Sequence, residues 1–150
     1  MAFFRDQDAI SGKMAKAYAT INGRVYELFY AKSLEATIEK KKAEVPILGS
    51  TKTGQKATGW NGSGTMTIYY VTSLFRQLML NFIKKGQDFY FDLQVINEDP
   101  SSSVGKQTAV LKECNLDSVV AAKFDITTDD PLEEEVSFTF SDYELLSTFK

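Results

Sequence analysis

Much of this chain alternates apolar and polar residues with a period of two. Between residues 34 and 39, apolar side chains at the even positions alternate with the polar side chains of Glu35, Thr37 and Glu39. The same alternation recurs at residues 65–71, 89–96 and 136–140. Because successive side chains of a strand point to opposite faces, each segment predicts a strand with one buried side and one wetted side. The chain is therefore predicted to be mainly β.

Further strands are predicted from shorter or less regular patterns. Residues 14–20 and 25–30 flank Asn22 and Gly23, a pair typical of a two-residue hairpin turn because both residues accept a positive φ. The remaining strand predictions are Thr108–Leu116, Ser118–Asp125 and an extension of the last strand through Tyr143 and Leu145.

One segment has helical periodicity. Its apolar face consists of Leu74, Phe75, Leu78, Met79, Phe82 and Ile83. Thr72 and Ser73 can cap its start, two lysines complement the dipole at its end, and Gly86 suits the position just beyond a helix. The predicted fold is a β-sandwich or barrel with one flanking α-helix that covers the core.

Two segments are predicted to be irregular. Residues 1–12 are polar and are expected to form an arm that is ordered only where something docks on it. Residues 49–64 hold five of the nine glycines together with Lys52, Lys56 and Trp60, and they predict a long flexible loop. Loops of this length inside a compact domain are usually functional or disordered. With no internal repeat, residues 1–150 are expected to form a single domain.

Composition narrows the possible functions. The net charge of −3 and the pI of about 5.0 argue against a surface that grips nucleic-acid phosphates, although DNA could pass nearby without binding. The chain has no histidine, which excludes Ser-His-Asp and Cys-His catalysis. Its start lacks the apolar run of a signal peptide, and no apolar run approaches the roughly 18 residues that span a bilayer, so we expect a soluble protein made in the cytoplasm without membrane partners.

No motif predicts a catalytic, cofactor or metal site. Residues 49–56 approach a phosphate-binding loop, but Gln55 stands where the motif requires lysine and no helix is predicted to follow. The acidic run at residues 125–135 lacks the spacing and glycine of an EF-hand, so a solvated turn or an assembly contact is favoured. Cys114 is predicted to be a small buried apolar side chain.

The order of landmarks resembles the tail tube proteins of contractile-tailed phages, including those of PBSX-like Bacillus prophages. The similarity covers nearly the whole chain and is carried by residues 10–13, 34–40, 44–49, 56–65, 69–73, 84–91 and 132–143. It includes the stretches Lys56–Thr65, with Trp60 at its centre, and Leu132–Tyr143.

The resemblance implies a structural virion protein with an Hcp-like fold and no cofactor. Six subunits would form a ring, and rings would stack into the inner tube of the virion tail. Inner strands would join into one barrel around a lumen that passes DNA during ejection. Partners would be other copies of the chain, a contractile sheath, a baseplate that initiates the tube, and a tape measure protein.

Two sets of residues are predicted to serve assembly. The lumen-facing set is Glu35, Thr37, Glu39, Thr65, Thr67 and Tyr69, with the opposite assignment to the outer surface as the alternative. The ring-stacking set is Lys52, Lys56 and Trp60 in the 49–64 loop, acting together with the N-terminal arm. The alternative function is a monomeric β-barrel that binds a small apolar ligand in a large cavity, and an enzyme with perturbed carboxylates ranks below it.

Overall fold

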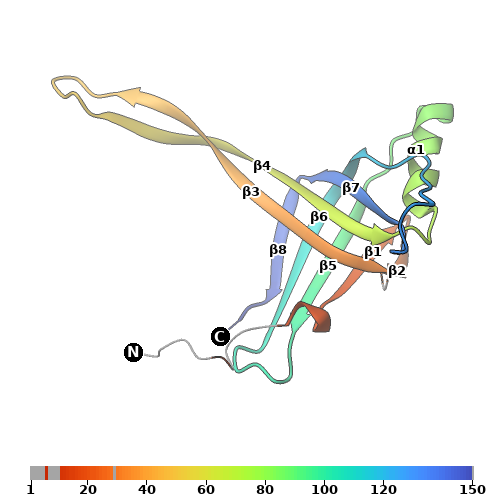
Figure 1. Ribbon diagram of the computed structural model, residues 1–150. Helices are drawn as coiled ribbons and strands as arrows, with labels where there is room; N and C mark the ends of the chain where they lie inside the picture. Colours follow the sequence, from red (N-terminus) through yellow and green to blue (C-terminus); the bar gives the residue numbers. More distant parts are fainter. Residues whose placement is uncertain (1–5, 7–10, 29, 150) are drawn as a thin grey trace.

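The computed structural model describes residues 6, 11–28 and 30–149, and these form an antiparallel β structure with one helix (Figure 1). A short 3-10 helix at Gly12–Met14 precedes the first strand. The strands are β1 (Lys16–Ile21), β2 (Arg24–Glu27), β3 (Ala31–Pro46), β4 (Thr53–Tyr69), β5 (Phe91–Glu98), β6 (Lys106–Ser118), β7 (Glu133–Phe140) and β8 (Asp142–Ser147). The helix α1 spans Leu74–Lys85 between β4 and β5. A mainly β fold with one helix is therefore confirmed.

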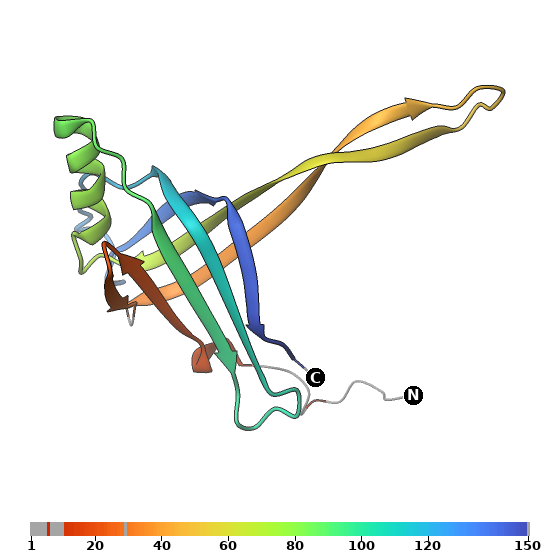
Figure 2. The ribbon, with the colours of Figure 1, turned by 180° about the vertical axis from the view of Figure 1, so that it is seen from behind.

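The strands form one path in the order β2-β1-β5-β6-β7-β4-β3, and β8 pairs with β6. Strand β6 belongs to both halves of this path. It pairs with β5 and β8 along most of its length, and its last residues, Asn115–Ser118, pair with β7. Because the partner changes along β6, the path folds over on itself, and the two halves enclose the apolar core. Figure 2 shows these two halves from the opposite side.

The core lies between the inner faces of the strands and under α1. Its largest fully buried side chains include Phe75 of the helix, Met66 and Ile68 of β4, and Phe138 of β7. The rings of Phe75 and Phe91 lie 6.2 Å apart at a tilted angle, which joins α1 to β5. Large apolar side chains thus fill the interior at the point where helix and sheet meet.

The predicted helix is confirmed with its bounds. Gly86 follows it in the left-handed conformation, with φ of 67°, and its N–H donates to the carbonyl of Phe82. At the start, the cap differs in detail from the prediction: the Leu74 N–H donates to the Thr72 hydroxyl at 3.3 Å, whereas Ser73 makes no side-chain cap. The predicted hairpin turn at Asn22 and Gly23 is also confirmed, with φ values of 53° and 79°.

The prediction of a loop at residues 49–64 is wrong. Strand β4 begins at Thr53, and only residues 47–52 connect it to β3. The glycines of this segment serve the strand: a Cβ built on Gly64 would lie 2.5 Å from Phe138 Cζ, and one built on Gly62 would lie 2.5 Å from Phe140 Cε2. Glycine is required here because aromatic rings of the neighbouring β7 lie across the β4 backbone.

The predicted strand Ser118–Asp125 is also wrong beyond its first residue. Residues 119–132 have no regular secondary structure. The register between β6 and β7 shifts between Leu116 and Ser118, and β6 ends there. A run of apolar residues alone does not make a strand where no neighbouring strand continues the hydrogen-bond ladder. Most of the predicted N-terminal arm, residues 1–12, lies outside the described residues.

Candidate assembly surfaces

One face of the β3-β4-β7 sheet is polar along its whole length. We call it the polar face. Its members are Ser33, Glu35, Thr37 and Glu39 of β3, Asn61, Ser63, Thr65, Thr67 and Tyr69 of β4, and Glu133, Glu135, Ser137 and Thr139 of β7. The opposite face carries the buried residues Met66, Ile68, Val136 and Phe138. Period-two alternation thus separates a core side from a wetted side across three neighbouring strands.

The register brings all six predicted lumen residues onto the polar face. Glu35 pairs with Thr65, and Thr65 pairs in turn with Ser137. Thr67 lies between Ser33 and Glu135. The six side chains therefore lie on one face of the sheet, and their position at a lumen stays a prediction.

Two polar-face carboxylates were not predicted from the sequence. The sequence analysis favoured a solvated turn or an assembly contact for the acidic run, and the structure places Glu133 and Glu135 in strand β7. Glu133 accepts a hydrogen bond from Lys32 Nζ at 2.6 Å, and this contact raises the pKa of the lysine. The signal that could have placed them is the alternation that continues from Phe140, Phe138 and Val136 back into this run. With Glu35 and Glu39, the polar face carries four carboxylates.

Glu134, which lies between these two glutamates in the sequence, has a different environment. Glu134 is 3% exposed and forms an ion pair with Arg76 of α1. The same guanidinium donates to the carbonyl of Thr72 and lies 4.5 Å from the ring centroid of Tyr70. This pair joins helix to sheet on the core side of β7, so it serves the fold and not the polar face.

The hairpin of β3 and β4 extends beyond the body of the molecule (Figures 1 and 2). Its last backbone pairing with a third strand is the pair between Gly62 and Phe140. From there outward, residues 39–46 and 53–61 form a two-stranded arm, with Glu39 paired to Asn61 and Pro46 to Thr53. A two-stranded arm projecting into solvent is a candidate for contacts with another molecule, because hairpins of this kind are marginally stable by themselves.

The predicted stacking residues are distributed along this arm. Lys52 adjoins the turn, and Lys56 is exposed on β4 opposite Ala43. Trp60 lies at the base of the arm, where its ring is 6.1 Å from that of Phe140. It also lines an apolar hollow of about 500 Å³ together with Ile38, Ala57 and Tyr143. Only Lys52 therefore lies near the outer end, and the three do not form one cluster.

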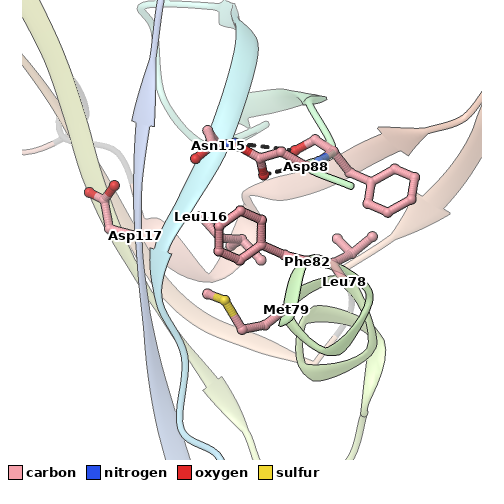
Figure 3. Close-up of a pocket in the computed structure, with 8 residues that line it drawn as sticks. Leu78, Met79, Phe82, Asp88, Asn115, Leu116 and Asp117 are labelled. Carbon is pink, nitrogen blue, oxygen red and sulfur yellow. Dashed lines mark hydrogen bonds between the residues drawn. The ribbon is translucent and has the colours of Figure 1, made fainter. Parts of the chain in front are cut away.

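A hollow between α1 and the end of β6 is drawn in Figure 3, where Leu78, Met79 and Phe82 of the helix line it together with Leu116. Its volume is about 110 Å³. Pockets for small molecules are usually about 300–1,000 Å³, so this hollow is too small for the apolar ligand of the alternative function. The Asn115 amide donates to the Phe89 carbonyl at 3.5 Å and partly closes one side.

A larger groove lies beside the N-terminal end of the described chain, and we call it the N-terminal groove. It has a volume of about 840 Å³. Apolar residues from several strands line it: Ala15, Ala17, Leu28, Ala31, Leu34 and Val95. Lys13, Lys16, Lys32 and Glu27 also line it, and Lys32 is paired with Glu133 at 2.6 Å, so the groove combines apolar side chains with charges of both signs.

The described residues form neither a metal site nor a reactive cysteine. No group of three or more acidic or cysteine side chains there could hold a metal ion. Burial raises the pKa of Cys114 to about 12, so its thiol stays protonated near neutral pH. The turn at residues 47–52 is followed by strand β4 and not by the helix that a phosphate-binding loop requires. Among the helices of the described residues, none is long and apolar enough to cross a membrane.

Comparison with known proteins identifies the family. The model of the family described as phage tail tube protein matches residues 2–147. The PBSX phage-like element protein XkdM of Bacillus subtilis (strain 168) is 44% identical over 139 residues, which are 93% of this chain and 91% of XkdM.

Two solved structures have a similar fold. A Bacillus subtilis protein is 38% identical, with 91% of this chain and 99% of that chain covered and a TM-score of 0.52. A chain from the sheath-tube complex of the PVC extracellular contractile injection system, in its extended state, has a TM-score of 0.68 at 14% identity, with 95% of each chain covered. The match to the family model and the identity to XkdM together show that this chain belongs to the phage tail tube protein family, as a structural component of the tail tube and not an enzyme.

Proposed function

We propose that six copies of this chain form a ring, and that rings stack into the inner tube of a contractile tail. The polar face lines the lumen, and DNA passes through it during ejection. The observation that carries the proposal is the separation of faces in the β3-β4-β7 sheet. One side packs the core of the subunit, and the other is a continuous band of hydroxyl and carboxylate side chains.

Strand direction supports closure of a ring by strand pairing. Strands β3, β4, β7 and the end of β6 alternate in direction, because each pair is antiparallel. In copies related by rotation about the tube axis, the outer edge of β3 therefore runs antiparallel to the end of β6 in the next copy. Strand β3 is an edge strand 16 residues long. Pairing between copies would cover this edge, which otherwise invites aggregation.

Charge supports a lumen that carries DNA without holding it. Four carboxylates lie on the polar face, of which Glu133 is paired with Lys32, and the whole chain has a net charge of −3. Phosphates of DNA would be repelled by such a surface, so the genome could slide through the tube. No lysine-rich strip that would retain DNA lies along the polar-face strand β7, whose charged residues are all glutamates.

The same proposal assigns the other partners. The β3–β4 arm, with Lys52, Lys56 and Trp60, and the N-terminal segment contact the adjacent ring. A sheath surrounds the outer surface, a baseplate component initiates the tube, and a tape measure protein sets its length. The similarity in fold to a chain of a sheath-tube complex supports this arrangement.

Negative-stain electron microscopy of the purified, concentrated protein tests the proposal, with size-exclusion chromatography alongside. The expected result is six-fold rings and hollow tubes of uniform width. A chain that stays monomeric at every concentration, including after addition of baseplate components from the same tail, would contradict it.

A further inference from the structure

The connection between β5 and β6 contains a carboxylate that is more buried than is usual for a charged group. Asp99 is 8% exposed, whereas aspartate is seldom buried unless it is paired or hydrogen-bonded. One of its oxygens accepts hydrogen bonds from the Ser101 N–H at 3.0 Å and from the Ser101 hydroxyl at 2.6 Å. The other oxygen accepts a hydrogen bond of 3.0 Å from the Ser11 N–H, 88 residues earlier in the chain. We call this last contact the Asp99 anchor.

A second aspartate shows which features of Asp99 belong to its local turn. The Asp125 carboxylate accepts hydrogen bonds from the N–H and the hydroxyl of Thr127, as the Asp99 carboxylate does from Ser101. Asp125 is nevertheless exposed, and its hydrogen bonds both come from this neighbouring residue. A turn of this kind therefore requires neither burial nor a distant partner. The burial of Asp99 and its contact with Ser11 point to a further role.

The hydrogen bonds of Asp99 favour its charged form. They lower the pKa of the carboxyl group below its ordinary value, with the Ser101 hydroxyl contributing most and the N–H groups of Ser11 and Ser101 next. A backbone N–H binds an ionised carboxylate more strongly than it binds a neutral acceptor. The Asp99 anchor is therefore a charge-assisted hydrogen bond near neutral pH.

The segment that the anchor holds buries little surface of its own. Ser11 caps the 3-10 helix Gly12–Met14 by accepting a hydrogen bond from the Lys13 N–H, and no residue of this helix is buried. The Met14 N–H donates to the Ser11 carbonyl at 3.3 Å, which shapes the turn but does not attach it to the sheet. Segments with few buried contacts open at a low cost in free energy. Attachment of this turn therefore depends strongly on the anchor.

We propose that the Asp99 anchor fixes the place at which residues 1–10 leave the subunit, and that this positioning promotes the stacking of rings. The inference rests on the proposed function, in which the N-terminal segment contacts the adjacent ring. A segment with a fixed origin loses less conformational entropy on binding than one whose origin moves. Asp99 is thus a positioning residue that acts through Ser11.

Two substitutions remove the anchor from opposite sides. Asp99→Ala removes the acceptor together with its local turn. Ser11→Pro removes the N–H donor and leaves the turn of Asp99 and Ser101 in place, and the φ of −80° at Ser11 is one that proline adopts. Asp125→Ala is the control for the first, because it removes the same kind of turn elsewhere. Ser11→Ala is the control for the second, because it removes the helix cap and keeps the N–H.

NMR relaxation of backbone amides in the unassembled subunit measures whether the anchor holds the turn. In the wild type, we expect the order parameters of Gly12–Met14 to be about 0.85, as in a rigid backbone. In Asp99→Ala and Ser11→Pro they should fall below about 0.6, as in a flexible segment. Both controls should keep the wild-type values. Circular dichroism during thermal unfolding confirms that each variant is folded.

Sedimentation and negative-stain electron microscopy measure whether the position of the turn affects assembly. Asp99→Ala and Ser11→Pro should form rings, but tubes should require a protein concentration roughly fivefold higher than the wild type needs, because more entropy is lost at each contact. The two controls should assemble like the wild type. The double variant should assemble no worse than either single variant, since both substitutions remove one contact.

Order parameters that stay at the wild-type values in both Asp99→Ala and Ser11→Pro would overturn the anchor. Lowered order parameters together with tubes at the wild-type concentration would overturn its part in stacking and leave the proposed function standing. Additive defects in the double variant would also overturn the inference, because the two residues would then act separately. A wild-type chain without rings or tubes would contradict the proposed function itself.

Discussion

At the scale of residues, the ion pair of Arg76 and Glu134 is the most buried of the ion pairs in the described part of the chain. The carboxylate is almost completely buried, and the guanidinium also contacts Thr72 and Tyr70. Removing one charge of a buried pair leaves the other without compensation. We therefore expect Glu134→Gln to lower the free energy of unfolding by about 3 kcal/mol. Urea unfolding of the unassembled chain, followed by circular dichroism, measures this change.

The matched control is Glu144→Gln, which removes the exposed pair of Lys112 and Glu144 at 3.1 Å. Exposed pairs contribute roughly 0–1 kcal/mol, so this variant should unfold almost like the wild type. Equal effects of the two substitutions would mean that the buried pair does not fix the helix to the sheet.

The glycines of β4 provide a second test at this scale. Gly64→Ala places a methyl group 2.5 Å from Phe138 Cζ and 2.9 Å from the backbone oxygen of Glu35, so both neighbours must shift. Forcing an extra carbon into a packed core typically costs about 1–3 kcal/mol. Gly59→Ala on the same strand meets nothing within 4 Å and should leave the midpoint of thermal unfolding nearly unchanged. Similar midpoints for both variants would show that the aromatic rings do not require glycine at residue 64.

At the scale of elements, the helix was predictable and the arm was not. The helix signal is local, since its apolar face, its capping residues and Gly86 all lie within one short segment. The glycines of β4 were interpreted as loop residues because the reason for them is not local. That reason lies in Phe138 and Phe140 of β7, more than 70 residues further along the chain.

The difference between local and non-local signals also explains which other predictions were confirmed and which were wrong. Residues 119–125 begin with four consecutive apolar residues but have no neighbouring strand, and no sequence pattern within the segment reveals that. The six predicted lumen residues lie on one face because alternation fixes the face of a strand wherever its register is known. The full exposure of Leu48 at the outer end of the arm was not predicted, since the arm itself was not predicted.

Shortening the arm tests its role as an element. Replacing residues 44–55 by an Asn-Gly turn joins Ala43 to Lys56, which are already paired, and keeps the register of the rest. Pairing of β4 with β7 begins at Gly62 and is untouched. We expect a folded subunit that forms rings but no tubes in electron micrographs.

The control keeps the arm and replaces only Lys52 and Lys56 by serine. If the exposed apolar residues Val45, Ile47 and Leu48 at the end of the arm supply most of the stacking contact, this variant still forms tubes. The yield of tubes should then depend less on salt concentration than it does for the wild type. Tubes of normal length from the shortened arm would show that stacking uses other surfaces.

For the whole molecule, the separation of faces determines how the subunit can assemble. A sheet with one core side and one hydroxyl- and carboxylate-rich side can line a water-filled channel, and alternate strand directions allow it to continue into the next copy. The direction in which the polar face points therefore decides the proposal, and accessibility in the assembled tube measures it.

Thr65 lies in the middle of the polar face and Ile83 on the exposed side of α1, so cysteines at these two positions report on opposite surfaces. In unassembled subunits, both should react equally fast with a maleimide attached to a polymer too large to enter the lumen. In tubes, Thr65→Cys should become at least tenfold slower, since the polymer is excluded, whereas Ile83→Cys should keep its rate. A small maleimide should still reach both, because the lumen is filled with water. If Thr65→Cys in tubes reacts with the polymer as fast as in free subunits, the polar face is the outer surface and the lumen is lined by other strands.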